Sequence, residues 1–356
     1  MAALHDDPLL DAARQSAVIA VHRMRHWSRE LTAAAVDSKD GRNNLVTLAD
    51  AEIEALVRGR LLRLRPEDVV VGEENSASVR LEDHESGGEL TALLAGAFER
   101  APESGVPEDA GAVGARTHEW HVDPIDGTVN FVRGIEHYCF SAGVRALPEA
   151  VPGAAPASGA ALLTGADQPA AADGAADADA GWVAGLVAAP ALDRVWFARA
   201  GSAWTAPLTA LTDPAVEAVP LTGASAPTSG RVVATGFGYS RERRAQQLAS
   251  LGAVMEEFDD LRRCGSAALD LCMVAEGRVN AYYERGLGIY DFAGGAYIAE
   301  CAGRWVRRRP DAFGAGAGGV GGGSASPASG AEPVGAPELT VAADSRERLE
   351  FLLRTG

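Results

Sequence analysis

Residues 123–131 read Asp-Pro-Ile-Asp-Gly-Thr-Val-Asn-Phe, and no other part of the chain says as much about its chemistry. Asp123 and Asp126 put two carboxylates into one tight turn. Pro124 between them fixes φ and offers no N–H group. Carboxylate and carbonyl oxygens are the ligands that Mg²⁺ prefers, and substrate phosphate and water usually complete its coordination. The stretch therefore predicts a metal site.

A helix that begins just after Gly127 would add an anion site to the same turn. The first N–H groups of a helix have no intrahelical acceptor, so they point outward and favour a phosphate. Gly127 lets the backbone approach a ligand closely, and Thr128 contributes a hydroxyl. Short Asp/Gly strings also form ordinary surface turns, and this alternative stays open on the stretch alone.

Three other acidic segments bear on this site. Asp50 follows an Asn-Leu-Val-Thr segment, Glu73 and Glu74 follow an apolar strand and a glycine, and Asp291 opens a helix of small residues. Each has an alternative explanation when it is taken alone. Asp50 and Asp291 would be helix N-caps, and the Glu-Glu pair would be a solvated strand end.

Taken in order, these segments resemble the inositol monophosphatase family of Mg²⁺-dependent, lithium-sensitive phosphatases. That family has a lysine and then L-V-T-x-x-D, followed by G-E-E, D-P-I-D-G-T-x-N-F and W-D-x-A-A-G. The matching stretches of this chain are Lys39 with Leu45-Val46-Thr47 and Asp50, Gly72-Glu73-Glu74, Asp123 to Phe131, Arg262 to Ala268, Ala281-Tyr282-Tyr283-Glu284, and Tyr290-Asp291-Phe292-Ala293-Gly294-Gly295.

The resemblance implies a mixed α/β (α+β) fold, a five-layered α-β-α-β-α sandwich with the metal site between two lobes. Residues 1–222 would form an N-terminal lobe with most metal ligands, and residues 223–356 a C-terminal lobe with Asp291 and the substrate-selecting residues. Mobile insertions are predicted at about 76–116, 148–181 and 312–336. The last two are rich in small residues without periodicity, and such stretches bury too little apolar area to offset their ordering entropy.

Metal ligands follow from the same resemblance. Glu73, Asp123 and the carbonyl of Ile125 would hold a first Mg²⁺, and Asp123, Asp126 and Asp291 a second. Glu73 with waters would hold a weaker third. Metals in such sites sit ~3.5–4 Å apart, so a carboxylate must bridge them, and Asp123 is the natural bridge because it comes first in a rigid turn.

Catalytic roles are likewise implied by the family. Thr128, oriented by Asp50, would help Glu73 to position and deprotonate the attacking water. The N–H groups of Gly127 and Thr128 would bind the phosphate, and no covalent phospho-enzyme is implied. Lys39 would be a charge on a mobile loop near the metals, and its alternative is an ordinary solvent lysine.

Substrate selection maps to the second half of the chain. Glu284 corresponds to the acid that binds inositol in the family, and Ala267 to a neighbouring backbone contact, while Asp291 borders both metal and substrate. The alternative for Glu284 is a strand-end charge. Tyr290 stands where the family usually has Trp, and Gly288 stands where some inositol phosphatases have His, so inositol specificity does not follow from the metal ligands.

The predicted activity is hydrolysis of inositol 1-phosphate or a similar polyol or sugar phosphate, with two to three Mg²⁺ ions and inhibition by lithium expected from the family. Histidinol phosphate, fructose 1,6-bisphosphate and 3′-phosphoadenosine 5′-phosphate are alternative substrates. A metal-binding regulatory protein that has lost turnover is the non-enzymatic alternative. The partner is then a small-molecule phosphate ester, and a homodimer is expected from the family.

Composition narrows the remaining classes of function. The net charge of −17 argues against binding to nucleic acid or to an anionic membrane, since both need basic surfaces. The four cysteines form no C-x-x-C pair, which favours reduced thiols and a cytoplasmic location. No apolar run is long enough to predict a transmembrane helix, and no basic leader precedes an apolar stretch at the N-terminus.

Overall fold

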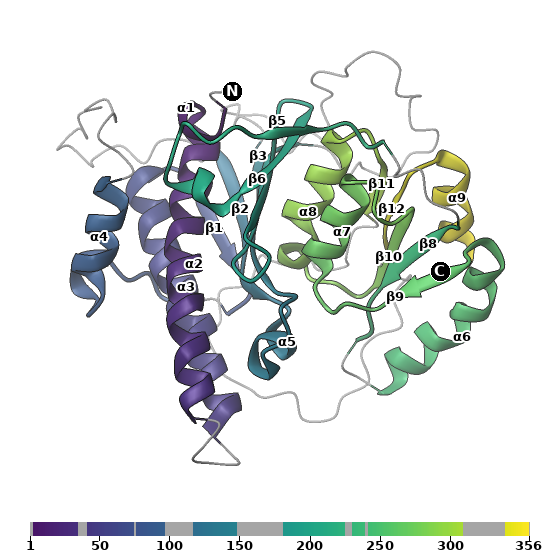
Figure 1. The fold of residues 1–356 in the computed structure, drawn as a ribbon, viewed down its shortest axis with the longest axis horizontal. Coiled ribbons are helices and arrows are strands. Elements are labelled where there is room, and N and C mark those ends of the chain that lie inside the picture. Colours follow the sequence, from purple (N-terminus) through teal and green to yellow (C-terminus); the bar gives the residue numbers. More distant parts are fainter. Residues whose placement is uncertain are drawn as a thin grey trace, which may run out of the picture.

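The structure is a computed structural model. It describes residues 3–34, 41–74, 76–96, 117–147, 181–224, 230–238, 241–308 and 339–355. In these ranges layers of helices alternate with two β-sheets, which confirms the predicted five-layered α/β sandwich (Figure 1). Lys39, almost all of the predicted insertion at 148–181 and all of the one at 312–336 lie outside the described residues. Among the described helices, none is both long and apolar enough to cross a membrane.

Helices α2 (Pro8–Ala34) and α3 (Gly41–Leu64) form the first outer layer, with α4 (Gly87–Gly96) packed beside α2. The apolar side of α2 faces the first core, where Leu10 and Met24 are fully buried. A short helix, α1 (Ala3–Asp6), precedes α2. This layer covers one face of the first sheet and delivers Asp50 from α3.

The first sheet has seven strands in sequential order. They are β1 (Val69–Gly72), β2 (His118–Asp126), β3 (Cys139–Ala146), β4 (Trp182–Ala189), β5 (Arg194–Arg199), β6 (Ser202–Pro207) and β7 (Val219–Leu221). β1 and β2 run parallel, and the other neighbouring pairs are antiparallel. Gly72 at the end of β1 pairs with Val122, so Glu73 follows β1 at the level of Asp123 in β2.

The inner helical layer packs on this sheet through residues that have almost no side chain. A Cβ at Gly143 in β3 would collide with the Cβ of Ala293 in α8 (Ile289–Cys301). On the side of α8 that faces α7 (Ala267–Ala275), a Cβ at Gly295 would lie 2.8 Å from a backbone carbonyl oxygen of α7. The Ala-Gly-Gly run therefore lets α8 lie directly on β3 and against α7.

The second sheet has five strands in the order β11-β12-β10-β8-β9. They are β8 (Val232–Thr235), β9 (Asp260–Arg262), β10 (Ala281–Arg285), β11 (Trp305–Arg308) and β12 (Leu339–Ala343). α7 and α8 contact this sheet on its inner face. Helices α6 (Arg241–Glu257) and α9 (Arg346–Thr355) pack on its outer face (Figure 1).

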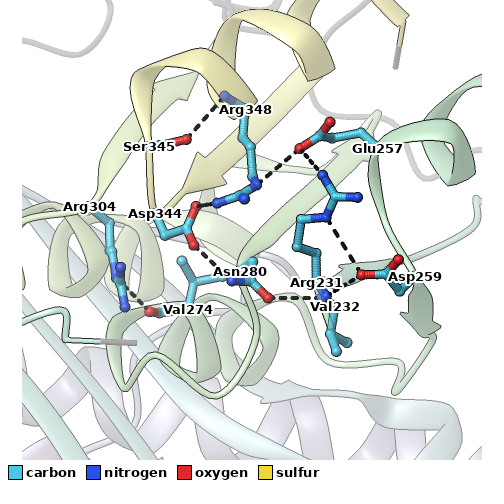
Figure 2. Close-up of polar contacts among 10 residues, drawn as sticks. All are labelled: Arg231, Val232, Glu257, Asp259, Val274, Asn280, Arg304, Asp344, Ser345 and Arg348. Atoms are coloured by element: carbon cyan, nitrogen blue, oxygen red, sulfur yellow. Dashed lines mark hydrogen bonds and ion pairs between the residues drawn. The ribbon is translucent and has the colours of Figure 1, made fainter. Parts of the chain in front are cut away.

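A chain of polar contacts fixes the start of β10, the strand that carries Glu284 (Figure 2). The side chain of Asn280 accepts a hydrogen bond from Val232 N at 2.8 Å and donates one to Asp344 at 2.8 Å. Arg348 donates to Asp344 at 2.6 Å and to Glu257 at 3.2 Å. These contacts connect β8, β10, β12, α9 and α6, so the position of β10 is set by most of the second sheet.

The start of α3 differs from the prediction. With Asp50 as an N-cap the helix would begin at residue 51, whereas α3 begins at Gly41. Residues 42–58 contain neither proline nor glycine, so nothing in them interrupts a helix. The alternative in which Asp50 is an N-cap is therefore wrong, because Asp50 lies well inside the helix.

Part of the predicted insertion at 76–116 is folded. A short 3₁₀ turn at Leu81–Asp83 leads into α4, and Leu81, Leu90 and Leu94 are buried in the first core. The prediction of mobility is wrong for this part, because its leucines supply the apolar area that the other insertions lack. The sequence analysis also missed β7 and β11, which are short and, in β11, rich in arginine.

The division into lobes at residues 222 and 223 stays a prediction. It would fall between β7, the last strand of the first sheet, and β8, the first strand of the second.

Candidate active site

A β-bulge brings the two aspartates of the Asp-Pro-Ile-Asp turn to one face of β2. Asp123 pairs with Ser141 and Asp126 with Cys139, so three steps along β2 match only two along β3. In a regular strand, residues three apart point to opposite faces, because successive side chains alternate. The extra residue in the bulge shifts this alternation by one position, so that both carboxylates lie on the same side of the sheet. Pro124 is tolerated there because a bulge needs no N–H group from it.

Local hydrogen bonds hold this turn. Asp123 Oδ1 accepts from Ile125 N at 3.0 Å, and Thr128 Oγ1 donates to Ile125 O at 2.9 Å. The predicted helix begins directly afterwards as α5 (Thr128–Arg133). Gly127 at its N-cap has a φ of 92°, and a Cβ there would lie 2.9 Å from a backbone carbonyl oxygen. Both the conformation and the close approach require glycine.

The side chain of Asp126 connects β2 of the first sheet to the start of α7. Its Oδ2 accepts hydrogen bonds from Ser266 Oγ at 2.6 Å and from Ala268 N at 2.7 Å. Ser266 also caps α7, since its Oγ accepts from Leu269 N at 3.3 Å. The hydroxyl of Ser266 therefore has two roles, as the cap of α7 and as a donor to Asp126. The donors fix one oxygen of Asp126 and thereby orient the whole carboxylate.

Asp291 joins the two aspartates of β2 from the first turn of α8. The helix begins at Ile289, its N-cap is Gly288, and Asp291 Oδ2 accepts from Gly288 N at 2.7 Å. The alternative in which Asp291 is the N-cap is therefore wrong, although its carboxylate does satisfy a backbone donor at the helix start. One carboxylate oxygen from each of Asp123, Asp126 and Asp291 lies within 4.8 Å of the others.

No basic side chain compensates the charge of these three aspartates among the described groups that shift their pKa values. Burial raises the pKa of Asp123 and of Asp291 well above the usual value, and repulsion from Asp126 raises both further. Burial also raises the pKa of Asp126 to about 6, although the hydrogen bond from Ser266 acts in the opposite direction and lowers it. An oxygen-only, uncompensated donor set of this kind fits a hard divalent cation.

Glu73 lies at the exposed side of this cluster. Its side chain is exposed to solvent, yet the protein around its carboxylate raises its pKa to about 7, with repulsion from Glu74 and Asp126 adding to the shift. Glu73 in turn raises the pKa of Asp123 and of Asp291. β1 ends at Gly72, so Glu73 and Glu74 both lie beyond the strand.

Glu54 in α3 holds the Glu73 segment in place and was missed by the sequence analysis. Its fully buried carboxylate accepts from Glu74 N at 2.7 Å and from Ser76 N at 2.7 Å. A Cβ at Gly72 would collide with this carboxylate, so glycine at 72 makes room for it. The available signal was the spacing of four residues between Asp50 and Glu54, which puts both acids on one helix face.

Asp50 approaches the site from α3. It is buried, and burial followed by repulsion from Glu73 raises its pKa to about 8. Its Oδ1 is buried and has no hydrogen-bond partner among the described residues. The Thr128 hydroxyl donates to Ile125 O, so no hydrogen bond joins it to Asp50 in this arrangement.

The predicted substrate-selecting residues also come near the cluster. Glu284 in β10 accepts a hydrogen bond from the hydroxyl of Tyr282 at 2.7 Å, and its carboxylate fills space left by Gly236. Burial raises the pKa of Glu284 to about 7, and repulsion from Asp126 adds to the shift. Ala267, the first residue of α7, is buried directly after the Asp126 donor Ser266.

Two departures from the family pattern are physically coupled. A Cβ at Gly288 would lie 2.6 Å from Cζ of Tyr290 and 2.9 Å from its hydroxyl oxygen. The tyrosine ring therefore occupies the space that a side chain at 288 would need. A residue larger than glycine at 288 requires this ring to move.

Comparison with known proteins agrees with this geometry. The model of the inositol monophosphatase family matches residues 5–155 and 174–351. The chain belongs to the inositol monophosphatase family. An inositol-1-monophosphatase of Mycobacterium leprae is 34% identical over 299 residues, which cover 83% of this chain and 80% of that protein. A Vibrio cholerae protein named Nus factor SuhB is 26% identical over 270 residues, 76% of this chain and 73% of that one.

Solved structures give the same assignment. The structure of Mycobacterium tuberculosis SuhB superposes with a TM-score of 0.58 at 28% identity, covering 98% of this chain and 96% of that one. The inositol monophosphatase family consists of phosphatases that are generally metal-dependent, and this agrees with the uncompensated carboxylates described above.

Proposed function

We propose that this chain is a Mg²⁺-dependent phosphomonoesterase that hydrolyses inositol 1-phosphate or a similar small polyol or sugar phosphate. One observation carries the proposal. Two buried aspartates, Asp123 and Asp126, and the partly buried Asp291 offer ligand oxygens within 4.8 Å of one another, and no basic side chain is among the described groups that shift their pKa values. Such a group is stable in its ionised form only with cations.

The residues that would hold these cations are Asp123, Asp126, Asp291, Glu73 and the carbonyl of Ile125. Two to three Mg²⁺ ions and inhibition by lithium are proposed from the family. When bound, Mg²⁺ neutralises charge on the phosphoryl group and lowers the pKa of water. Asp123 is proposed as the shared ligand, since the bulge aims it at both Asp126 and Asp291.

Glu73 is proposed as the group that accepts the proton of the attacking water at its carboxylate. Its exposure at the side of the cluster supports access to water. Thr128 Oγ1 donates to Ile125 O, which leaves its own lone pairs free to accept a hydrogen bond from that water. Asp50, whose carboxylate is close enough to Glu73 for its pKa to be raised by it, is proposed to orient this pair.

Phosphate and leaving group would bind on opposite sides of the cluster. The N–H groups of Gly127 and Thr128 are proposed donors to the phosphate oxygens. Glu284 is proposed to accept hydrogen bonds from hydroxyls of the leaving group, with Ala267 and Asp291 lining the same side. The hydrogen bond from Tyr282 leaves one oxygen of Glu284 for a ligand.

The Tyr290 ring beside Gly288 gives a specific reason to test other esters. In the family some inositol phosphatases carry histidine at the position of Gly288, and here the tyrosine fills that space instead. Histidinol phosphate, fructose 1,6-bisphosphate and 3′-phosphoadenosine 5′-phosphate therefore remain alternative substrates. The cationic amine of histidinol phosphate would find an acidic partner at Glu284.

The deciding experiment measures phosphate release from these esters, from inositol 1-phosphate and from p-nitrophenyl phosphate, with and without Mg²⁺. We expect Mg²⁺-dependent turnover of all or several esters, with the highest kcat/KM for a polyol phosphate and turnover lower by several orders of magnitude in Asp123→Asn. Failure of every ester at saturating Mg²⁺ would leave the non-enzymatic alternative, a metal-binding regulatory protein, which the Vibrio cholerae relative's name also suggests. The homodimer, the lobe boundaries and the cytoplasmic location stay predictions.

A further inference from the structure

A second group of metal-ligand side chains lies behind the Asp-Pro-Ile-Asp-Gly-Thr turn. It consists of His137 before β3, Cys264 before α7, and Asp270 in α7. One ligand atom from each of the three lies within 4.8 Å of the others. None of these residues is among the carboxylates of the candidate active site, and this group contains nitrogen and sulfur as well as oxygen.

We propose that His137, Cys264 and Asp270 form a binding site for a borderline-soft divalent ion such as Zn²⁺, separate from the carboxylate cluster. Imidazole, thiolate and carboxylate are the three side-chain ligands that zinc takes, and three of them leave a fourth tetrahedral position for water. Hard Mg²⁺ prefers oxygen ligands. The carboxylate cluster would therefore prefer Mg²⁺, and the mixed nitrogen, sulfur and oxygen group would prefer Zn²⁺.

The ligand atoms already face one another. Nε2 of His137 lies 3.3 Å from Oδ1 of Asp270, a separation typical of two ligands that share one zinc ion at ~2.0–2.2 Å. The side chain of Asp270 is 2% exposed and that of His137 is 19% exposed. Cys264 is partly exposed as well. The site therefore has a buried floor and an open side through which an ion can enter.

The backbone that carries the ligands is fixed independently of any ion. Nδ2 of Asn130 donates to His137 O at 2.7 Å and to Cys264 O at 2.8 Å, so one amide clamps the two ligand-bearing loops together. Asp270 N donates to Ser266 O at 3.0 Å inside α7. Preorganisation of this kind lowers the ordering cost of binding.

Protons must move for zinc to bind. In the metal-free protein His137 and Cys264 both interact with the Asp270 carboxylate, and burial raises the pKa of the Cys264 thiol. Zinc would take the place of these protons. The thiol proton leaves to solvent, and the imidazole keeps its single proton on Nδ1, so that Nε2 is free. Burial raises the pKa of Asp270, while His137 and Arg263 oppose this shift and favour the ionised form, in which Asp270 can serve as a ligand.

The alternative is that His137 and Cys264 only satisfy a buried aspartate by hydrogen bonding. Titration of the metal-stripped protein with Co²⁺, a spectroscopic substitute for Zn²⁺, separates the two interpretations. A thiolate bound to Co²⁺ gives a charge-transfer absorption in the near ultraviolet, whereas a carboxylate does not. We expect this absorption to saturate at one ion per chain and to disappear when Zn²⁺ is added.

Variants assign the signal to this group. Cys264→Ser should abolish the absorption, and His137→Gln should weaken Co²⁺ binding by more than about tenfold. Cys301→Ser is the matched control, because Cys301 is also a partly exposed free thiol. The absorption should be unchanged in this control, and also in Asp123→Asn, which alters the carboxylate cluster alone.

Two results would overturn the proposal. One is Co²⁺ binding without a thiolate absorption in the wild-type protein. The other is an absorption that survives Cys264→Ser, which would point to Cys139 beside Asp126, where the sulfur lies 3.9 Å from Oδ2. If a variant fails to fold, zinc X-ray absorption of the wild-type protein and of Cys301→Ser decides instead. A sulfur neighbour in both supports the site, and a shell of oxygen and nitrogen alone rejects it.

Discussion

The hydroxyl of Ser266 donates a 2.6 Å hydrogen bond to Asp126, and the same oxygen caps helix α7 by accepting from Leu269 N. One side chain thus joins the bulged end of β2 to the first turn of α7. Because Asp126 is buried, its orientation depends on this contact and on the neighbouring N–H of Ala268.

Ser266→Ala is expected to lower the free energy of unfolding by about 3 kcal/mol at pH 8. It removes a helix cap, worth about 1 kcal/mol, and a hydrogen bond to a charged group, worth about 1.5–3 kcal/mol. Ser345→Ala is the matched control, since Ser345 caps α9 at 3.3 Å from Arg348 N without a carboxylate partner (Figure 2). Urea unfolding of both variants measures the difference. Equal losses would show that the Asp126 contact contributes nothing.

Glu54→Gln is expected to raise the Mg²⁺ concentration needed for half-maximal activity by tenfold or more, with a smaller loss of kcat at saturating Mg²⁺. Glu54 holds Glu74 N and Ser76 N, so its change loosens the segment that presents Glu73. Glu52→Gln on the same helix is the control, because Glu52 binds Arg23 and Trp27 away from the site. A Mg²⁺ titration of both variants checks this. An unchanged Mg²⁺ requirement in Glu54→Gln would remove its positioning role.

Asp123→Asn should reduce turnover by several orders of magnitude while leaving the metal-free protein as stable as the wild type or more stable. The substitution keeps the shape but removes one charge from a buried group that repels Asp126 and Asp291. Turnover at saturating Mg²⁺ and thermal unfolding in chelator measure the two effects. Retention of a tenth of wild-type turnover would contradict the bridging role.

The metal-free protein is expected to lose stability as the pH rises from 5 to 8. The folded protein raises the pKa of Asp126 to about 6, of Glu73 to about 7 and of Asp50 to about 8, all above the ordinary values near 4. A raised carboxyl pKa means that the folded state holds its proton more tightly. The stability from this source is therefore complete below pH ~4 and is lost as the pH passes the folded-state values.

Urea unfolding at pH 5, 6, 7 and 8 in chelator measures this loss, and the same series with Mg²⁺ is the control. With Mg²⁺ we expect the free energy of unfolding to fall less with rising pH, or to rise, because a cation favours the ionised carboxylates. A metal-free stability that rises through this range would mean that the carboxylates are not strained in the fold.

Glu284→Gln should lower kcat/KM for a polyol phosphate and leave that for p-nitrophenyl phosphate almost unchanged. The aryl ester has no hydroxyls to bind, while a polyol would lose a hydrogen bond to a charged group, about 1.5–3 kcal/mol or roughly tenfold to a hundredfold in rate. Steady-state kinetics on both esters checks this. An equal loss on both would mean that Glu284 supports the metal site, and no loss on either would make it a strand-end charge.

Much of the site could be predicted from short-range patterns. The Asp-Pro-Ile-Asp-Gly-Thr order by itself determines a proline-stiffened turn with a positive-φ glycine, because these are properties of neighbouring residues. The helix that follows Gly127 and the Ser266 cap are local in the same sense. The Ala-Gly-Gly run at 293–295 likewise marks a helix that packs closely, although not what it packs against.

Only the tertiary structure decided which groups meet. The bulge that turns Asp126 to the side of Asp123 arises from the register of β2 on β3, and Asp291 reaches them because Gly143 admits α8. Long-range packing also decides two other contacts. Glu54 supports the Glu73 segment, and a histidine, a cysteine and an aspartate from separate segments come together. Local dihedral preferences set the face on which a side chain lies, but the group opposite that face is set by long-range packing, which no short stretch of sequence encodes.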